Sequence, residues 1–444
     1  MNRDELRANV DTIVIVVMEN RSFDHVLGHL QSPKYGNRGD VDGIEDESKD
    51  RYLNPNMDGQ GISPFWVDDA GFQSDLPHDP EAVTTQLAYA DATGGYAMNG
   101  FAKAYEQEFH TSVPNPAVMG LLTPQSVPTT GALAGRYTVC DRWFACLPTS
   151  TAPNRLMGMC GYTDARDTGT LLPSQPTVYE WLRDHGVRWR VYSAGLPFCA
   201  LMPSMMTLLL TTHFRKLDQL ESDQATETAT DWPQVIFVEP DYYDCPFHRR
   251  PPCDNHAPLG MAPGEAFLAE VFTTLSSNAE RWARTVFILT YDEHGGFFDH
   301  VPPLAVKYRN SSGEVSFDST GVRVPAIVAG PFAAPTCSHV QLDNTSILQL
   351  LAERFGQSSE AYSAQVAARA RQGIASVSEV LSASAGNTLP CDVSGTSTDT
   401  GSAQVVTVKN ILRDGFHQAA VNLVNNHGAE ALQKFPEMRA YLGK

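Results

Sequence analysis

The chain has 444 residues, of which 42% are hydrophobic and 19% charged, a composition that excludes a disordered or fibrous protein. Its 32 Lys and Arg residues against 51 Asp and Glu residues give a net charge of −19, which repels polyanions and makes nucleic acid an unexpected partner. No apolar run approaches the roughly 20 residues that a transmembrane helix needs. Any contact with lipid is therefore expected to be local and transient.

The first residues, Met1–Asp11, carry charges and lead into an apolar run without the small-residue cleavage site of a secretory signal. We therefore expect a protein that is cytoplasmic or exported by a leaderless route, unless a leader has been removed. One large core with excursions is expected for a chain of this length.

Five apolar runs bounded by turn residues predict strands, at Thr12–Met18, Arg188–Tyr192, Gln234–Val238, Thr285–Thr290 and Pro325–Val328. Helical patterns lie between them, most clearly at Thr177–His185, Pro263–Leu275 and Thr345–Phe355, the last preceded by Asn344 as a capping residue. Strands that alternate with helices predict an α/β fold, with a mostly parallel central sheet sandwiched by helices.

Three segments depart from this alternation. Residues 34–78 are rich in Gly, Asp, Asn and Pro with little periodicity, so we expect a surface excursion, a wall or lid, within a large domain of residues 1–380. A Ser/Thr/Gly-rich segment at 381–404 is expected to be a linker. Residues 405–444 have helical patterns and are expected to form a small appendage packed on the same domain.

The eight cysteines contain no Cys-x-x-Cys pair, which disfavours a thiolate metal site. Cys245 and Cys253 flank a Pro-rich turn, where either a disulfide or two unpaired buried thiols fits the pattern. The cysteine pattern therefore does not distinguish a reducing from an oxidising compartment.

Pairs of polar residues follow two of the predicted strands. Glu19 and Asn20 come directly after the first strand, and Asp292 and Glu293 follow the strand at Thr285–Thr290. An isolated pair of this kind is usually a solvated turn or a helix cap. Two pairs at strand ends instead indicate a shared site, because hard divalent cations prefer such oxygen ligands.

A third polar segment runs from Thr149 to Arg155 and has the sequence TSTAPNR. Its hydroxyls precede a Pro at the expected start of a helix, where capping is their ordinary role. A helix N-terminus with Arg155 nearby also favours a phosphate or sulfate group.

Together these segments resemble the bacterial phosphoesterase family of non-haemolytic phospholipases C and related acid phosphatases. The matching segments, in the family's order, are Glu19–His25, Thr151–Arg155, Val238–Asp241, Tyr291–Pro303, Arg323–Ile327 and Asn344–Leu348. This family belongs to a wider alkaline-phosphatase-like group, whose fold is a central sheet between layers of helices.

The resemblance implies a single divalent metal ion held by Glu19, Asn20, Asp292 and Glu293. Thr151 would be a further ligand and the nucleophile, passing through a phosphothreonine intermediate. This role makes chemical sense, since a threonine hydroxyl needs activation to attack at neutral pH. The ligands do not distinguish calcium, magnesium, manganese and zinc.

Two histidines, His78 and His256, match family positions around the phosphate, in the segments LPHD and DNHAP. Each is expected to donate a proton to a phosphoryl oxygen or to the leaving group. The alternative for each is a structural or surface histidine.

The resemblance implies a metal-dependent phosphoric ester hydrolase, most simply a phospholipase C acting on phosphatidylcholine-like lipids. A broad acid phosphatase uses the same motifs and is the main alternative. A sulfatase is disfavoured, because Thr151 cannot supply the formylglycine that sulfatases need. From a different class, a non-catalytic binding protein that retains the fold remains open.

Overall fold

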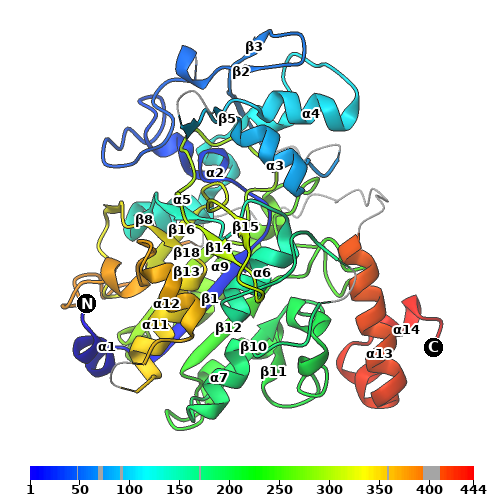
Figure 1. Ribbon diagram of the computed structural model, residues 1–444. Helices are drawn as coiled ribbons and strands as arrows, with labels where there is room; N and C mark the ends of the chain where they lie inside the picture. The colour runs from blue at the N-terminus through cyan, green and yellow to red at the C-terminus, as the bar shows by residue number, and fades with distance from the viewer. Residues whose placement is uncertain (48, 69–73, 91–93, 170–171, 358–359, 394–410) are drawn as a thin grey trace.

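The computed structural model describes residues 1–47, 49–68, 74–90, 94–169, 172–357, 360–393 and 411–444 (Figure 1). Within them, one eight-stranded sheet forms the centre of the larger, lower lobe in Figure 1. Its strands, in spatial order, are β11 (Phe214–Lys216), β10 (Trp189–Ser193), β12 (Val235–Glu239), β1 (Thr12–Met18), β13 (Thr285–Tyr291), β16 (Ala326–Ala329), β8 (Thr138–Cys140) and β17 (Cys337–Ser338).

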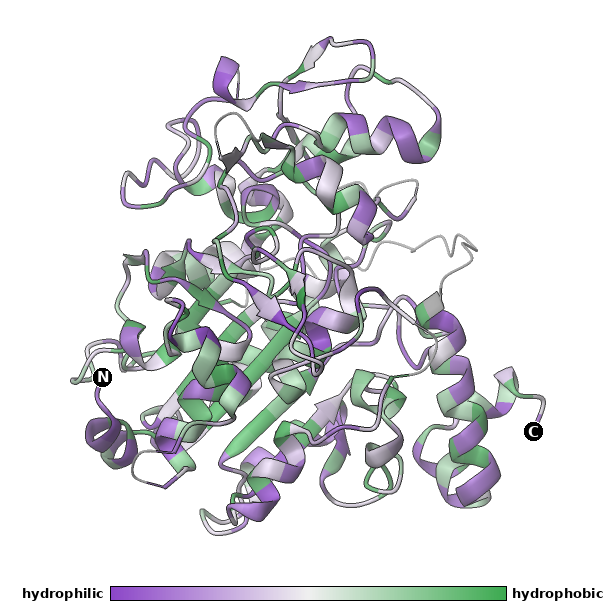
Figure 2. Ribbon diagram, in the orientation of Figure 1, coloured by the Kyte–Doolittle hydropathy of each residue, from purple (hydrophilic) through white to green (hydrophobic). Residues whose placement is uncertain are grey.

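The sheet is mostly parallel. Strands β11, β10, β12, β1 and β13 run in one direction, and β16 alone is antiparallel to its neighbours β13 and β8. Strand β1 reads TIVIVVM and is buried almost throughout, as expected of a central strand covered on both faces. Figure 2 shows the resulting apolar centre of the sheet.

Helices cover both faces of the sheet, which confirms the predicted fold class. One set of packed helices contains α6 (Thr151–Cys160), α7 (Val178–Asp184), α11 (Thr345–Phe355) and α12 (Ala364–Ala370). The other contains α5 (Pro128–Arg136), α8 (Leu220–Thr226), α9 (Ala262–Ser276) and α10 (Ala279–Trp282).

One helix was not predicted, and one predicted cap was wrong. The N-terminal segment forms helix α1 (Arg3–Asn9), which starts with a capping box between Asn2 and Glu5. Asn344 does not cap α11 with its side chain. It accepts a hydrogen bond from the Trp143 indole and donates one to the Tyr291 carbonyl instead, so it ties the helix start to β13.

The excursion at 34–78 is more than a surface feature, because it helps to build a second hydrophobic core in the upper lobe. Ile44, Tyr52, Ile62 and Leu76 are buried there. The lobe contains α3 (Pro80–Leu87), α4 (Phe101–Phe109), the pair β2 (Asn54–Pro55) and β3 (Gly61–Ile62), the pair β4 (Phe65–Val67) and β7 (Gly120–Leu122), and the pair β5 (Tyr89–Ala90) and β6 (Gly95–Tyr96). These elements are too short to give a periodic signal in the sequence.

Smaller elements complete the described chain. They are α2 (Phe23–Leu27), the pair β9 (Trp143–Phe144) and β18 (Leu342–Asp343), and the pair β14 (Tyr308–Arg309) and β15 (Val315–Phe317). In the part of the chain described, the eight cysteines are free, so Cys245 and Cys253 form no disulfide here.

The C-terminal helices are α13 (Ile411–Lys434), interrupted at Gly428, and α14 (Glu437–Tyr441). Phe416 of α13 packs against Phe198 and Tyr242, and the pair of helices lies beside the lower lobe in Figure 1. The predicted linker is described only as far as residue 393, where the Asn387 side chain is hydrogen-bonded to the main body. No helix in the described ranges is both long and apolar enough to cross a membrane.

Candidate active site

The parallel register between β1 and β13 explains why the two polar pairs meet. Met18 pairs with Tyr291 at the ends of these strands, so residues 19–20 and 292–293 leave the sheet side by side. The backbone N–H of Asp292 donates to the Met18 carbonyl (3.1 Å), and the N–H of Asn20 donates to the Asp292 carboxylate (3.2 Å). The predicted ligands therefore lie at the carboxyl ends of two central strands, where open α/β sheets bind ligands.

The loop between β1 and α2 is held in an unusual conformation. Asn20 has a φ of 59°, in the left-handed region that few non-glycine residues occupy. Gly295 lies against it with a φ of 61°, and a Cβ there would lie 2.1 Å from the Asn20 carbonyl oxygen. The close approach of these two loops thus requires glycine at position 295.

Thr151 is the first residue of α6, and it is almost completely buried. Its hydroxyl donates a hydrogen bond to the Asn20 side-chain oxygen (3.3 Å). Neither of the preceding hydroxyls caps the helix, since Ser150 donates to Asp167 and Thr149 to the Arg166 carbonyl. The structure thus brings Thr151 to the two strand ends.

Arg155, one turn further along α6, has a different role from the expected contact with phosphate. Its guanidinium donates to the carboxylates of Asp292 (3.0 Å) and Glu19 (3.3 Å) and to the carbonyls of Val17 and Met18. Arg155 is therefore the counter-charge between the ends of β1 and β13.

The carboxylates of Glu19 and Asp292 lack sufficient positive charge around them, whereas the pKa of Glu293 is lowered because His78 and His294 outweigh the effect of burial. Burial, reinforced by repulsion from Asp292, raises the pKa of Glu19 well above its usual range, and burial raises the pKa of Asp292 to about 6. The Oε2 atom of Glu19 and the Oε1 atom of Glu293 are buried without a hydrogen-bond partner. Buried, unpartnered carboxylate oxygens fit a divalent cation, which would supply both charge and coordination.

His78 and His256 lie at the same site. The Nε2 atom of His78 is 3.4 Å from the Asn20 amide nitrogen and 3.9 Å from Glu293 Oε1, and its Nδ1 atom donates to the Leu76 carbonyl. The His256 ring is 6.1 Å from that of His78 and stacks on Tyr243.

Neighbouring carboxylates favour the charged forms of both histidines. Burial opposes protonation of His78, but Glu293 and Asp75 raise its pKa to about 9. Burial also opposes protonation of His256, whose pKa is raised by Asp75 and Asp244. His78 is therefore predominantly protonated near neutral pH, and the protonated form of His256 is also favoured.

Sequence reasoning missed two acidic residues of the site. Asp75 forms a group with His78 and His256, and Asp244 forms one with Glu19 and His256; the ligand atoms in each group lie within 4.8 Å of one another. Asp75 precedes the LPHD segment by one residue, and Asp244 follows β12 in a Tyr-rich loop. Their closeness in sequence to His78 and to the end of β12 is the signal by which the sequence could have predicted them.

The hydroxyl of Thr151 opens into a cavity of about 340 Å³ between the lobes. Its carboxylates are those of Asp75, Asp79, Glu108, Asp167 and Asp244. Among the residues that the structure describes, neither Lys nor Arg lines it, whereas Phe109 and Leu412 provide apolar surface. The described lining is therefore acidic, and it brings the Thr151 hydroxyl together with His78 and His256.

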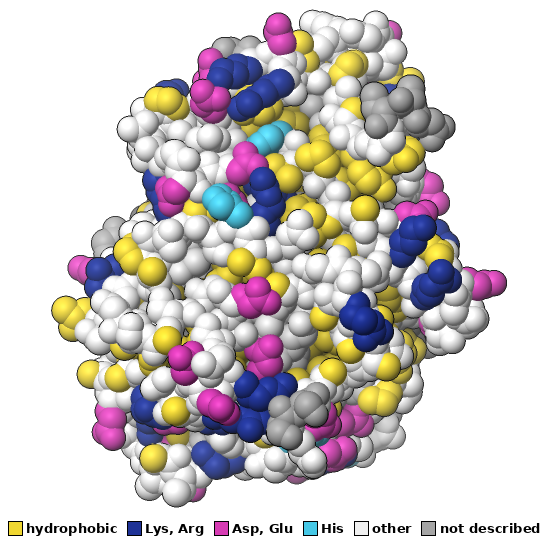
Figure 3. Space-filling model, turned by 60° about the vertical axis from the view of Figure 1, so that its left-hand side comes forward, with side chains coloured by type: hydrophobic (Ala, Val, Ile, Leu, Met, Phe, Trp, Pro, Cys, Tyr) yellow, Lys and Arg dark blue, Asp and Glu magenta, His cyan; other side chains and the backbone are white. Residues whose placement is uncertain are grey.

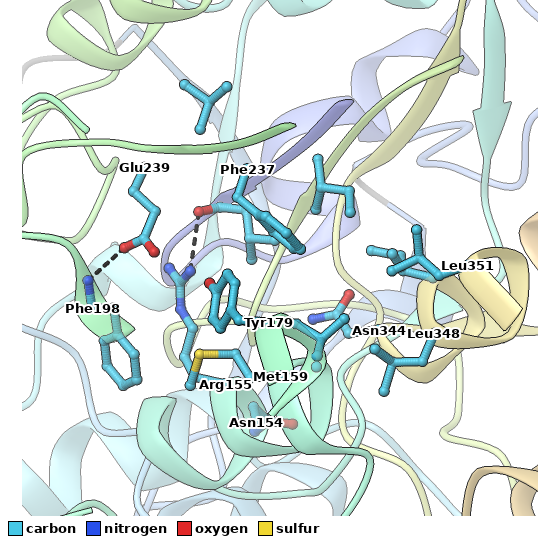
Figure 4. A pocket seen from close by; sticks show the side chains of 16 residues that line it. Asn154, Arg155, Met159, Tyr179, Phe198, Phe237, Glu239, Asn344, Leu348 and Leu351 are labelled. Atoms are coloured by element: carbon cyan, nitrogen blue, oxygen red, sulfur yellow. Dashed lines mark hydrogen bonds between the residues drawn. The ribbon is translucent and has the colours of Figure 1, made fainter. Parts of the chain in front are cut away.

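A second cavity, of about 60 Å³, lies behind Arg155 (Figure 4). Apolar side chains such as Tyr179, Phe237 and Leu348 surround it, while its Glu239 accepts a hydrogen bond from the Phe198 N–H. None of the predicted metal ligands lines it. The acidic cavity at Thr151 is thus the candidate substrate site.

Comparison with known proteins gives one family match, to the Phosphoesterase family, over residues 10–358. Non-specific phospholipase C1 of Arabidopsis thaliana is 32% identical over 345 residues, which are 74% of this chain and 62% of that protein. Phospholipase C B of Mycobacterium tuberculosis is 27% identical over 78% of this chain and 74% of its own length.

The hemolytic phospholipase C of Pseudomonas aeruginosa is 28% identical, over 78% of this chain and 53% of that protein. The chain thus spans less than two thirds of the length of several relatives. Among solved structures, a protein in the alkaline phosphatase superfamily from Vibrio parahaemolyticus aligns with 52% of this chain and 60% of its own, at a TM-score of 0.34 and 11% identity.

Proposed function

Since this chain belongs to the Phosphoesterase family, we propose that it hydrolyses phosphoric esters with Thr151 as the nucleophile, acting as a phospholipase C on phosphatidylcholine-like lipids. The observation that carries the proposal is the hydrogen bond from the Thr151 hydroxyl to Asn20, at the point where the carboxylates of β1 and β13 converge. A hydroxyl at a helix N-terminus is well placed for an approaching phosphate.

Glu19, Asn20, Asp292 and Glu293 would hold a divalent cation, with the Thr151 hydroxyl as a further ligand, and the cation would lower the pKa of that hydroxyl and offset phosphoryl charge. The unpartnered oxygens of Glu19 and Glu293 support this assignment. The oxygen-rich donor set suits calcium, magnesium or manganese and also accommodates zinc.

In the proposed reaction the Thr151 hydroxyl gives up its proton to solvent as its oxygen forms a bond to phosphorus in line with the leaving alcohol, and the bond from phosphorus to the diacylglycerol oxygen breaks. The leaving oxygen takes a proton from His78 or His256, whose raised pKa values keep a proton available. Water then cleaves the phosphothreonine and releases the phosphorylated headgroup.

The charge of the cavity favours the phospholipase over the acid phosphatase. Among the described residues that line it, five carboxylates outnumber the two histidines and neither Lys nor Arg occurs, so a cationic headgroup such as choline is attracted. A phosphomonoester, which carries a second negative charge, is disfavoured by the same field. The names of the relatives agree with this choice.

The test compares purified protein on phosphatidylcholine, p-nitrophenyl phosphorylcholine and p-nitrophenyl phosphate. The expected result is release of phosphocholine from the lipid and hydrolysis of the nitrophenyl diester, with the monoester a poor substrate. Hydrolysis of the monoester alone would establish the acid phosphatase instead. Failure on every ester after supply of each candidate metal would favour a non-catalytic binding protein.

A further inference from the structure

A second cluster of metal-ligating side chains lies outside the candidate active site, at the edge of the sheet. Asp141 directly follows β8, and Cys337 and His339 lie on and just after the edge strand β17. Parallel pairing aligns Cys337 with Val139. Because alternate residues of a strand share a face, the side chains of Cys337, His339 and Asp141 are directed to the same side.

The ligand atoms of these three residues lie within 4.8 Å of one another. His339 Nδ1 is 2.8 Å from Asp141 Oδ1, and the other oxygen of Asp141 accepts the backbone N–H of Asp42 (2.8 Å). That second hydrogen bond orients the carboxylate, as supporting contacts do in metal sites. The Asp141 side chain is fully buried, whereas that of His339 is 60% exposed, so an ion would have an open side toward solvent.

Charge distinguishes this cluster from another group of similar composition, formed by Asp24, Asp299 and His300. Arg323 pairs with both carboxylates of that group, at 2.9 Å each, and leaves no need for a cation. Among the residues that the structure describes, His339 is the one side chain that forms an ion pair with Asp141. The neighbouring Arg142 donates to the Asp42 carboxylate and to the backbone carbonyl of Asp141, not to the Asp141 carboxylate.

We infer that Asp141, Cys337 and His339 form a zinc site, separate from the catalytic centre, with water as the fourth ligand. Thiolate, imidazole and carboxylate are the ligands that Zn²⁺ takes in proteins, and the thiolate selects it over calcium or magnesium. On binding, Zn²⁺ displaces the Cys337 thiol proton to solvent. Figure 3 shows one face of the molecule, on which histidine, acidic and basic side chains gather where the two lobes meet.

The ion would connect two parts of the fold. Strand β17 has two residues and a single neighbour, and the Cys337 N–H donates to Asp40 of the upper-lobe segment. Since Asp141 also accepts the Asp42 N–H, a metal bound here would fasten the sheet edge to residues 40–42. Its role is structural, so the catalytic rate should not depend on it.

Cobalt provides the test, because a thiolate bound to Co²⁺ gives an intense charge-transfer absorption that oxygen and imidazole ligands do not give. The full-length protein, freed of transition metals, is titrated with Co²⁺. We expect the band in the unmodified protein and in Thr151→Ala, and its loss in Cys337→Ser and His339→Ala. Cys391→Ser, which removes the other partly exposed thiol, is the matched control and should retain the band.

Alkylation gives a second measurement that does not depend on the variants. Zn²⁺ should protect Cys337 from iodoacetamide in the unmodified protein, while Cys391 in the same sample reacts at an unchanged rate. The inference is overturned if no thiolate band forms, if Cys337→Ser retains the band, or if Zn²⁺ leaves the alkylation of Cys337 unchanged.

Discussion

The Thr151 hydroxyl donates to the side-chain oxygen of Asn20 at 3.3 Å, although 131 residues separate the two in sequence. Asn20 reaches this position because the loop after β1 turns through the left-handed region, and Thr151 because it begins α6. One polar contact thus links the first turn of a helix to the ends of the two central strands.

This contact predicts different outcomes for two substitutions of Thr151. Thr151→Ala removes the attacking oxygen and should lower hydrolysis on the order of 10⁴-fold or more, as loss of a nucleophile does. Thr151→Ser keeps the oxygen and should retain most of the activity. Steady-state kinetics on p-nitrophenyl phosphorylcholine measures both. Full activity in the alanine variant would remove Thr151 from the mechanism.

Substrates with different leaving groups should show whether His78 or His256 acts as the proton donor. If His256 or His78 protonates the departing oxygen, replacing that histidine by alanine should slow phosphatidylcholine hydrolysis roughly 10² to 10⁴-fold. The same variant should affect the nitrophenyl diester much less, because nitrophenolate leaves without a proton. Equal losses on both substrates would instead indicate a role in binding the phosphoryl oxygens.

Much of the fold followed from the sequence, because continuous apolar runs such as Thr12–Met18 have few alternatives to a buried strand. The pairing of Glu19 with Asp292 also followed, since parallel neighbours end at one edge of the sheet. Contacts made by irregular segments did not. Asp75 and Asp244 reach the site through loops without periodicity, and their positions depend on the packing of the upper lobe and of the loop after β12.

The direction in which a side chain points could not be predicted from the sequence either. Arg155 stood beside the expected phosphate site, yet it pairs with Asp292 and Glu19, because their buried charges attract it more strongly than an open cavity does. The apolar residues of segment 34–78 are similarly scattered among turns. Only the folded chain gathers Ile44 and Tyr52 into a second core.

Removal of the metal should lower both activity and stability. Without a cation, Arg155 is the ion-pair partner that the described residues offer to both Glu19 and Asp292, so chelation should lower the melting temperature and abolish hydrolysis. Elemental analysis before and after dialysis against a chelator identifies the ion, and re-addition should restore activity. Asp292→Asn should weaken rebinding of that ion, whereas Asp167→Asn, at the cavity rim, should not.

His300 predicts a loss of stability at alkaline pH. Its two ring nitrogens contact the carboxylates of Asp24 (2.6 Å) and Asp42 (3.1 Å), with the Arg323 guanidinium behind Asp24. Burial opposes protonation, but these carboxylates, Asp24 foremost, raise the pKa of His300 to about 9. Because the pKa of His300 is raised, its charged contacts stabilise the folded state fully below about pH 6.5, the pKa of histidine in the unfolded chain. This contribution to the free energy of unfolding is lost as pH rises through about 9.

Urea denaturation of the unmodified protein and of His300→Gln, at several pH values across this window, measures the effect. The difference in free energy of unfolding between the two proteins should shrink toward the alkaline end. His185→Gln is the control, because the His185 side chain is exposed to a similar extent (18% against 17%) and pairs with one carboxylate, that of Glu360, rather than two. A difference that stays constant with pH would show that His300 does not change its charge over this range.

Gly295 tests how closely the two polar loops must approach. A methyl group there would lie 2.1 Å from the Asn20 carbonyl oxygen, and a φ of 61° is itself unfavourable for alanine. Gly295→Ala should therefore push the Asn20 loop away from Asp292 and weaken metal binding and hydrolysis together.

Gly135→Ala, in helix α5 with nothing within 4 Å of the added carbon, is the matched control and should be neutral or stabilising by about 0.4–1 kcal/mol. Calorimetry should show a lower metal affinity in Gly295→Ala and an unchanged affinity in Gly135→Ala. An unchanged affinity in Gly295→Ala would mean that the site tolerates a wider separation of its strand ends.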